Sequence, residues 1–323
     1  MIKINTKERS YALGVQKKIG LFDFPFTLNP YIGCEMQCAY CFVPGPVIKK
    51  TRNDFFTTVE IKDKLLDTLK KELKQYKTLP QHLKRVQVGV TTELFQPKVI
   101  SNMRIGGNDD LVEKILATFK NEWDNGNKWM LHILTKNHNI INYLPILKNM
   151  KEMIQVEFSF IHHDEAVSRK YEKYTSSISK RLDAIKQISN EGIFVRVMAM
   201  PFYGDQCDLN KLKGITFAAG SKAFKNKELN YYDWSQFQGI NAIDPINRTK
   251  IKSNSHIPSL IIKSGEEKTP KIMVEVEMPK IRKRNEKFIN WAKKPNEGLE
   301  KQSLPQIEMG YSSINNVDWG YLK

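Results

Sequence analysis

The chain has 323 residues, 41% of them hydrophobic, which is enough to build the core of one large domain or two ordinary ones. Its 51 lysines and arginines exceed its 35 aspartates and glutamates by sixteen, so its field attracts polyanions, nucleic acid above all. The opening residues, MIKINTKERSYALG, contain no apolar run suited to a signal peptide or a membrane span, and we expect a cytoplasmic protein with no membrane partner. Only four cysteines occur and three fall within eight residues, which argues against a secreted disulfide scaffold.

Between about residues 26 and 200, short β-branched runs alternate with amphipathic stretches, the pattern of βα units around a parallel sheet. Each predicted strand is a nearly continuous apolar run, as strands buried on both faces should be. The predicted strands are Phe26–Gly33, Val86–Thr92, Trp129–Thr135, Ile154–Phe160 and Ile193–Met200.

Apolar residues between these strands recur at helical spacing and predict three helices that face the core. The three stripes are Ile61, Leu65, Leu66, Leu69 and Leu73; Leu111, Ile115 and Phe119; and Leu182, Ile185 and Ile188. Asp109 and Asp110 are candidates to cap the second helix, and Gly192 lies where the last helix should end.

The periodicity fades after residue 205. Two further β-like runs, Ser259–Ser264 and Lys271–Met278, flank the turn-like GEEKTP and predict a hairpin. We expect an N-terminal extension over residues 1–25, a barrel-like domain over 26–235, and a C-terminal lobe over 236–323 that closes the open side of the barrel.

The cysteines Cys34, Cys38 and Cys41 form a C-x3-C-x2-C segment directly after the first predicted strand. Three thiolates on one short loop can bind three corners of a four-iron, four-sulfur cluster and leave the fourth iron without a protein ligand. An open metal position is a place for chemistry. A structural zinc knuckle is the alternative, but it needs a fourth ligand close by, and the nearest later cysteine is Cys207.

This spacing, with the aromatic Tyr40 before the third cysteine, resembles the radical S-adenosylmethionine (SAM) superfamily. The resemblance implies a [4Fe–4S] cluster on the three cysteines and SAM chelated to the open iron. It also implies a reductant such as flavodoxin or ferredoxin, and a 5′-deoxyadenosyl radical that abstracts hydrogen from a substrate. The implied fold is a partial (βα)6 TIM-like barrel with a C-terminal α+β lobe, and the site lies on loops at the carboxyl ends of the strands.

Further segments between about residues 20 and 235 resemble the spore photoproduct lyase-like branch, whose members are often labelled DNA repair photolyases. They are NPYIGC (29–34), TTELFQP (91–97), LTKN (134–137), and the set Glu172, Ser177, Arg181 and Leu182 followed by AIKQISNEGI. This likeness, together with the positive charge, implies a nucleic acid base as the substrate.

Matched position by position, the resemblance places Glu93 near the amino group of SAM, Lys136 near its carboxylate and Ser159 near its ribose. Such pairings are chemically sound, since a cation pairs with a carboxylate and an acid with an ammonium. The alternatives are that Glu93 caps the next helix, that Lys136 is a solvated charge and that Ser159 is an ordinary strand residue. For Arg181 we expect a structural salt bridge.

The sequence also departs from the pattern of this branch. Family prolines are replaced at Lys173, Ser176 and Ile178, and Val99 stands where a glutamate is usual. Spore photoproduct lyases carry a hydrogen-donor cysteine downstream of the cluster, whereas no cysteine lies between Cys41 and Cys207 here. Thymine-dimer reversal is therefore not supported by the sequence.

Several other residues have both a functional and a structural interpretation. Cys207 is a weak catalytic candidate that could return a hydrogen atom to a product radical, although a buried inert thiol is the simpler interpretation. His162 and His163 could bind phosphate or move a proton, while Asp164 as a helix cap beside two loop histidines is the plainer account.

Two C-terminal segments suit a nucleic acid partner. NYYDWSQF (230–237) could stack bases or cover the barrel, and the basic residues of KIRKRNEKF (280–288) could contact phosphates or form a solvated face. Two other functions remain open. They are radical SAM chemistry on a peptide or small metabolite, and a non-catalytic, metal-stabilised nucleic-acid binding module.

Overall fold

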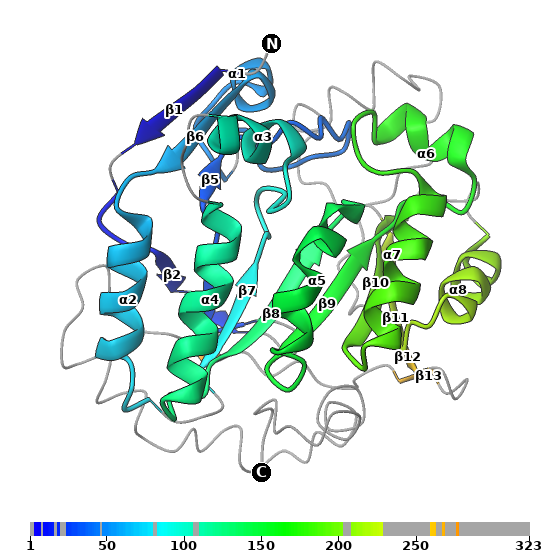
Figure 1. Cartoon of the computed structure of the whole chain (residues 1–323). Helices are drawn as coiled ribbons and strands as arrows, with labels where there is room; N and C mark the ends of the chain where they lie inside the picture. Colours follow the sequence, from blue (N-terminus) through cyan, green and yellow to red (C-terminus); the bar gives the residue numbers. More distant parts are fainter. Residues whose placement is uncertain are drawn as a thin grey trace.

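The computed structural model describes residues 3–7, 9–15, 18–19, 24–45, 47–79, 83–105, 110–202, 208–228, 259–262, 267–268 and 276–277. The fold is built on a nine-stranded sheet whose strands lie in the order β13-β12-β11-β10-β9-β8-β7-β4-β2 (Figure 1). Six neighbouring strands of this sheet run parallel: β4 (Phe26–Leu28), β7 (Arg85–Val88), β8 (Met130–Thr135), β9 (Ile154–Ser159), β10 (Phe194–Phe202) and β11 (Ala223–Glu228). They form the partial barrel expected from the sequence.

Antiparallel strands extend the sheet at both ends. β2 (Leu13–Val15) pairs with β4, while β12 (Ser259–Ile262) pairs with β11 and β13 (Glu267–Lys268). A separate three-stranded sheet holds β1 (Lys3–Lys7), β6 (Thr58–Lys62) and β5 (Tyr31–Ile32), and β3 (Lys18–Ile19) pairs with β14 (Val276–Glu277). The predicted domain boundaries at residues 25 and 235 stay a prediction.

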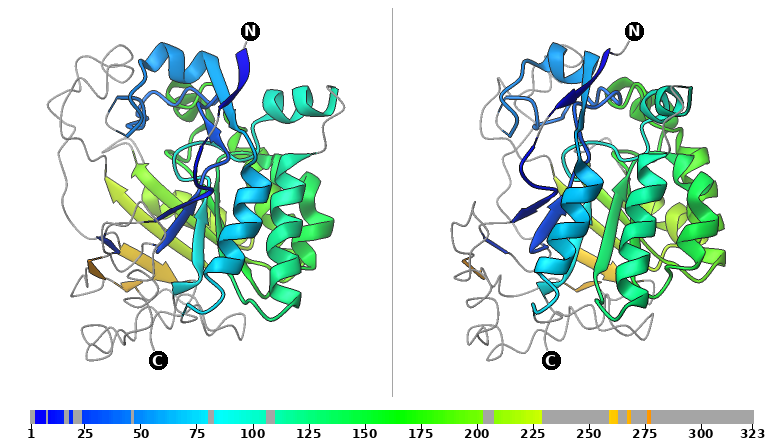
Figure 2. Two further views of the ribbon diagram at one scale, coloured as in Figure 1. Left: turned by 90° about the vertical axis from the view of Figure 1, so that its left-hand side faces the viewer. Right: turned by 60° about the vertical axis from the view of Figure 1, so that its left-hand side comes forward.

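The helices that follow the parallel strands cover one side of the large sheet (Figure 2). They are α2 (Leu65–Gln75), α4 (Leu111–Asp124), α5 (Leu144–Lys148), α7 (Ile178–Asn190) and α8 (Leu209–Ala218). The shorter α1 (Arg52–Thr57), α3 (Pro97–Ile105) and α6 (Glu165–Tyr171) lie at the carboxyl edge of the sheet, and the 3-10 turn η2 (His138–Tyr143) precedes α5.

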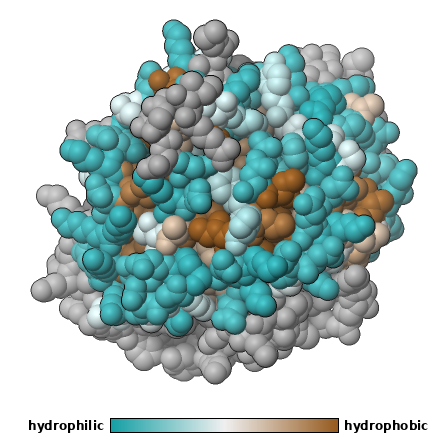
Figure 3. Space-filling view, viewed as in Figure 1, coloured by the Kyte–Doolittle hydropathy of each residue, from teal (hydrophilic) through white to brown (hydrophobic). Residues whose placement is uncertain are grey.

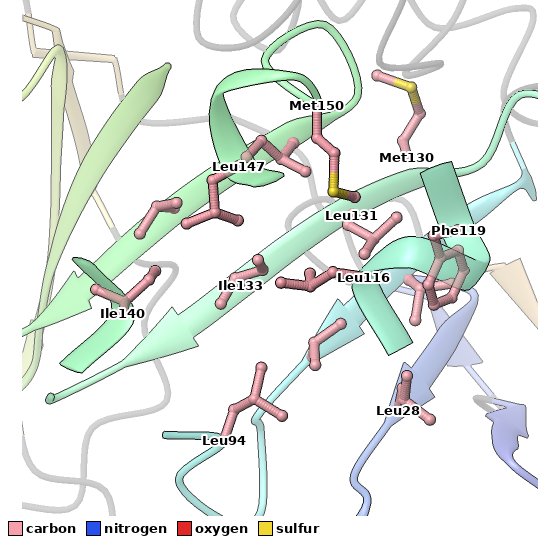
Figure 4. Close-up of a cluster of buried hydrophobic side chains, with 14 of the residues drawn as sticks. Leu28, Leu94, Leu116, Phe119, Met130, Leu131, Ile133, Ile140, Leu147 and Met150 are labelled. Carbon is pink, nitrogen blue, oxygen red and sulfur yellow. The ribbon is translucent and has the colours of Figure 1, made fainter. Parts of the chain in front are cut away.

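The main hydrophobic core lies between the sheet and these helices. Leu131 and Ile133 of β8 pack against Leu116 of α4 and Leu147 of α5, and all four side chains are at most 1% exposed (Figure 4). Burial of these side chains supplies the main driving force for folding. The outer face of the helices is mostly hydrophilic, with hydrophobic residues in smaller areas between them (Figure 3).

The predicted helix ends are largely confirmed. The Asp110 carboxylate accepts hydrogen bonds from the Val112 and Glu113 backbone N–H groups and so caps α4. Gly192 follows α7 with a φ of 77°, in the left-handed region that favours glycine. Ile61, however, belongs to β6 and not to the following helix, which begins at Leu65.

Three strand predictions need correction. The run Phe26–Gly33 divides into β4 and β5, which belong to different sheets, because Pro30 cannot donate to a ladder and the Asn29 side chain instead accepts from the Thr91 N–H. β12 pairs with β11 and with β13, which lies inside GEEKTP, and β14 (Val276–Glu277) pairs with β3. For the described residues of the run 271–278, the expected hairpin is therefore wrong; the connection from β12 to β13 is shorter and costs less loop-closure entropy. The sixth parallel strand, AFKNKE, was not predicted because it lacks an apolar run.

Among the described residues, no helix is both long and apolar enough to cross a bilayer. The cytoplasmic location stays a prediction.

Candidate functional site

The three cysteines lie on a loop that follows β5 at the carboxyl edge of the large sheet. The turn into this loop depends on Gly33, whose φ is 114° and where a Cβ would lie 2.2 Å from the Thr58 carbonyl oxygen. Only glycine fits such a close approach. The next residue, Cys34, donates its backbone N–H to the Phe55 carbonyl at 3.0 Å, which ties the loop to α1.

Arg52 at the start of α1 holds the second half of the loop. Its guanidinium donates to the carbonyl oxygens of Cys38, Ala39 and Cys41, each at 2.9 Å. Burial lowers the pKa of Arg52 from its ordinary value, although the group stays a cation because arginine titrates far above neutral pH. One side chain therefore fixes the backbone between the second and third cysteines.

None of the three cysteines forms a disulfide. Cys34 and Cys38 are buried and Cys41 is partly exposed. Burial raises the pKa of all three thiols, that of Cys38 to about 12, and outweighs the opposite effect of the Lys136 charge on Cys38 and Cys41. A metal at the loop would reverse this direction, because a coordinating thiol is deprotonated outright.

Glu93 lies beside the ends of β7 and β8. Its buried carboxylate accepts hydrogen bonds from the Phe95 N–H at 3.0 Å, the Thr135 hydroxyl at 2.7 Å and the Lys136 N–H at 2.8 Å. Burial raises its pKa in spite of these three bonds. The carboxylate ties the turn after β7 to the end of β8 and caps no helix among the described residues.

Three of the predicted cofactor residues meet around one buried carboxylate. The Lys136 Nζ lies 2.5 Å from the Ser159 Oγ and 2.8 Å from the Glu172 Oε1. The Tyr40 hydroxyl donates to the same Glu172 oxygen, and Lys136 Nζ lies 5.3 Å from the centre of the Tyr40 ring. The structure thus joins Tyr40 of the cysteine loop with the ends of β8 and β9.

The second oxygen of Glu172 contacts Arg181 of α7. The Arg181 guanidinium donates to Glu172 Oε2 at 2.9 Å and to the Ser159 carbonyl at 2.6 Å, and both side chains are almost fully buried. The expected structural salt bridge of Arg181 is confirmed. Burial alone would raise the pKa of Glu172, but the Lys136 and Arg181 charges lower it to about 2.

The two histidines after β9 have structural partners. Asp164 caps α6, accepting from the Ala166 and Val167 N–H groups, as the plainer account predicts. The Nδ1 of His162 accepts from the Asp164 N–H at 2.9 Å, and that of His163 accepts from the Asp208 N–H at 3.2 Å. Cys207 lies outside the described residues, as do the NYYDWSQF and KIRKRNEKF segments.

Polar side chains also cover the face of the sheet that points away from the helices. Glu157 of β9 forms a buried ion pair with Arg196 of β10, and its carboxylate lies 3.0 Å from the Nε2 of His132 of β8. Ser159 lies two residues further along β9, on the same face. This charged group continues from the Lys136 site into the interior of the partial barrel.

A sequence profile for the radical SAM superfamily matches residues 28–208, more than half of the chain. The chain belongs to the radical SAM superfamily. Enzymes of this superfamily use a [4Fe–4S] cluster and SAM, and these are the cofactors of this radical SAM protein. The matched range contains the cysteine loop and every contact of the site described above, including those of Glu157 with His132 and Arg196.

Comparison with similar proteins establishes the fold of this chain but assigns no role to any of its residues. An uncharacterized protein of Methanocaldococcus jannaschii is 22% identical over 218 residues, which are 66% of this chain and 75% of that protein. A variant of spore photoproduct lyase with bound AdoMet and dinucleoside spore photoproduct gives a TM-score of 0.55 at 12% identity, over 80% of this chain and 73% of the lyase.

A second structure of that lyase, complexed with dinucleoside spore photoproduct, gives a TM-score of 0.47 at 16% identity. In that match 62% of this chain spans 51% of the lyase, about half of its length. The match with the TM-score of 0.55 establishes a shared fold and nothing finer.

The donor set of the loop fits an iron–sulfur cluster. Three unpaired thiols on one short loop are what three corners of a cubane need. Among the residues that the structure describes, no three His, Cys, Asp or Glu side chains converge on a single metal ion. A cubane presents its irons at separate corners, so the thiols that bind it need not converge on one point.

Two of the residues described above were not recognised as functional from the sequence. Glu172 is only one member of the stretch that resembles the family, and nothing in the sequence shows that it contacts Tyr40, 132 positions earlier. Arg52 carries no signal of its own because its partners are backbone carbonyl groups.

Proposed function

We propose that this radical SAM enzyme acts on a nucleic acid base. The observation that carries the catalytic part is the contact between the cysteine loop and the strand ends, where Tyr40, Lys136 and Ser159 meet around Glu172. Two observations support the substrate class: the excess of sixteen positive charges, and the fold shared with a lyase that binds a dinucleoside photoproduct.

The residues have the following proposed roles. Cys34, Cys38 and Cys41 hold the cluster, while Lys136 binds the SAM carboxylate and Ser159 its ribose. Glu93 accepts from the Lys136 N–H, which orients the end of β8, and its carboxylate faces the amino group of SAM. Tyr40 packs between the cysteine loop and the ends of the strands. When bound and reduced, the cluster supplies the electron that splits SAM, and the adenosyl fragment abstracts hydrogen from the substrate.

The chemistry of Lys136 supports its role. An ammonium has three donors, and Ser159 and Glu172 occupy two of them in the structure. Lys136 and Arg181 carry two positive charges around the single carboxylate of Glu172. A further anion at Lys136 would therefore be attracted electrostatically.

The catalytic proposal is tested by anaerobic reconstitution of the cluster, reduction with dithionite and measurement of 5′-deoxyadenosine. We expect iron and sulfide in the wild type and formation of 5′-deoxyadenosine from SAM. The triple variant Cys34→Ala, Cys38→Ala, Cys41→Ala is expected to bind no cluster and form none. One zinc and no iron in the anaerobically purified wild type would contradict the proposal.

The substrate class is tested separately, by binding of DNA and RNA oligonucleotides to the reconstituted protein at increasing salt. We expect an affinity that falls linearly with the logarithm of the salt concentration, as counterions are released. If the protein forms 5′-deoxyadenosine but shows no salt-dependent binding, a peptide or small metabolite is the substrate.

A further inference from the structure

The Glu172 carboxylate is fully buried and accepts hydrogen bonds from four side chains. One oxygen accepts from the Tyr40 hydroxyl and from Lys136 Nζ at 2.8 Å. The other accepts from Arg181 at 2.9 Å and from the Ser168 hydroxyl at 3.4 Å. The four donors come from the cysteine loop, the end of β8, α7 and α6, so this one side chain connects four separate parts of the fold.

The backbone around Glu172 contacts the cysteine loop as well. Glu172 forms an isolated antiparallel bridge with Cys38, and the Ala39 N–H donates to the Tyr171 carbonyl at 2.8 Å. The Tyr174 N–H donates to the Met36 carbonyl at 3.4 Å. Residues 171–174 therefore hold the loop from Met36 to Ala39, while Arg52 in α1 donates to the carbonyl groups of Cys38, Ala39 and Cys41.

Burial makes the charge of Glu172 important. An unpaired carboxylate in the interior is strongly unfavourable, and so is an unpaired cation. Glu172 offsets Lys136 and Arg181 together, and its loss would remove the one carboxylate that contacts both cations. The position of the Lys136 ammonium beside Ser159 thus depends on Glu172.

From these contacts we propose that Glu172 is a positioning residue that holds the cluster loop and the Lys136–Ser159 pair in the relative position that SAM binding requires. It acts through Tyr40 on the loop side and through Lys136 on the strand side. This inference rests on the proposed function, since it concerns how the chain presents its own residues to SAM.

The test uses Glu172→Gln in the full chain with a reconstituted cluster. Glutamine keeps the shape but loses the charge, and its amide nitrogen cannot accept from Arg181. We expect iron and sulfide contents equal to those of the wild type, because all three thiols remain. The Kd for SAM should rise about 10- to 100-fold, as is typical when a group that orients a ligand-binding residue is lost.

The Kd is measured by equilibrium dialysis of SAM against the oxidised protein, which performs no turnover. A second measurement is the electron paramagnetic resonance spectrum of the reduced cluster. SAM should shift this spectrum in the wild type, and the variant should need a correspondingly higher SAM concentration for the same shift.

Glu165→Gln is the matched control. Glu165 is the first residue of α6, in the same segment as Glu172, and forms an exposed ion pair with Arg169 at 2.7 Å. It also accepts a hydrogen bond from the Ile178 N–H at 2.6 Å, which the side-chain oxygen of glutamine can still accept. We expect no change in SAM affinity because exposed pairs contribute little. A rise equal to that of Glu172→Gln would overturn the proposal, because any loss of charge on this segment would then suffice.

Tyr40→Phe provides a second variant that leaves both ion pairs intact. It removes only the hydroxyl that joins the loop to Glu172, and we expect the Kd for SAM to rise about 3- to 10-fold. If Glu172→Gln fails to fold, the SAM affinity of Tyr40→Phe tests the positioning role in its place. An unchanged SAM affinity in Tyr40→Phe, or in a folded Glu172→Gln, would overturn the positioning role.

The two proposals fail in different ways. A wild type that binds no cluster or forms no 5′-deoxyadenosine contradicts the proposed function itself. A wild type that forms it, together with a Glu172→Gln protein of unchanged SAM affinity, contradicts the positioning role alone.

Discussion

The two faces of strands β8 to β10 differ sharply in chemistry although they share the same backbone. Toward the helices β9 presents Ile154, Val156 and Phe158, all buried in the main hydrophobic core. Toward the other side it presents Gln155, Glu157 and Ser159, which are equally buried but polar. Successive side chains of a strand point to opposite faces, so the two sets alternate residue by residue.

This contrast separates the residues that stabilise the fold from those available for chemistry. Apolar burial on the helix side stabilises the protein, whereas buried charges on the other side cost desolvation energy that their ion pairs only offset. Such a charged face is retained when something other than stability depends on it. In this chain it leads directly to Ser159 and Lys136 at the carboxyl edge.

The largest effect is expected from Phe158→Ala on the helix side. Phe158 is fully buried, and its truncation should lower the free energy of unfolding by about 3–5 kcal/mol because a cavity remains. Urea denaturation of the cluster-free protein measures this. If Phe158→Ala lowers the free energy of unfolding by no more than an ordinary surface substitution does, the two faces do not differ as described.

Glu157→Gln should lower the unfolding free energy by about 3 kcal/mol, since it removes the carboxylate that pairs with the buried Arg196 cation. The double variant Glu157→Gln, Arg196→Met should recover most of that loss, because the buried cation is removed together with the carboxylate. Urea denaturation of the single and double variants distinguishes the two faces of the sheet, because the stability lost to the Phe158→Ala cavity cannot be recovered by a second truncation. If the losses of Glu157→Gln and Arg196→Met simply add up in the double variant, the described difference between the two faces is contradicted.

Ser159→Ala should separate binding from folding at the residue adjacent to Phe158. We expect the Kd for SAM to rise about 3- to 10-fold through loss of the hydroxyl that contacts Lys136, with less than about 1 kcal/mol change in unfolding free energy. Dialysis and urea denaturation of the same preparation give both values. A stability loss as large as that of Phe158→Ala would be evidence against separate roles.

The smallest effect concerns an ion pair near the surface, Glu60 of β6 with Lys50 at 3.0 Å and Lys7 at 3.3 Å. Burial alone would raise the pKa of Glu60, but the two lysines lower it below 4.5. Its contribution to stability is therefore present above pH 4.5 and lost as the pH falls through the lowered pKa.

Glu60→Gln should accordingly cost about 0.2–1 kcal/mol at pH 7 and less at pH 3. Chemical denaturation of wild type and variant at both pH values measures the difference. A difference that grows toward low pH would have the wrong sign for this ion pair.

The sequence predicts the parallel core well because the relevant signals are local. The apolar runs containing Val86, Leu131, Ile154 and Val195 all become neighbouring strands. Pro30 marks the break between β4 and β5, but whether a proline ends a strand or shifts it to a second sheet depends on distant partners such as Lys62, which donates to the Pro30 carbonyl.

The site was predictable only where a residue type reveals its chemistry. The cysteine spacing indicates a cluster, and the likeness of LTKN to the family indicates Lys136. The role of Glu172 was not predictable: the family resemblance includes this residue, but nothing in the sequence shows that it contacts both Tyr40 and Lys136. The polar face of β8 to β10 was also missed: the runs read as continuously apolar, although Gln155, Glu157, His132 and Arg196 interrupt them.

The contact between Ala39 and Tyr171 also bears on the order of events during synthesis. The cysteines leave the ribosome early, whereas the segment that holds their loop follows 132 positions after Tyr40. An iron–sulfur donor that meets the nascent chain before then encounters three thiols on an unsupported peptide. We therefore expect truncated chains that keep the cysteine motif but end before Tyr171 to retain less iron than the whole chain after the same reconstitution.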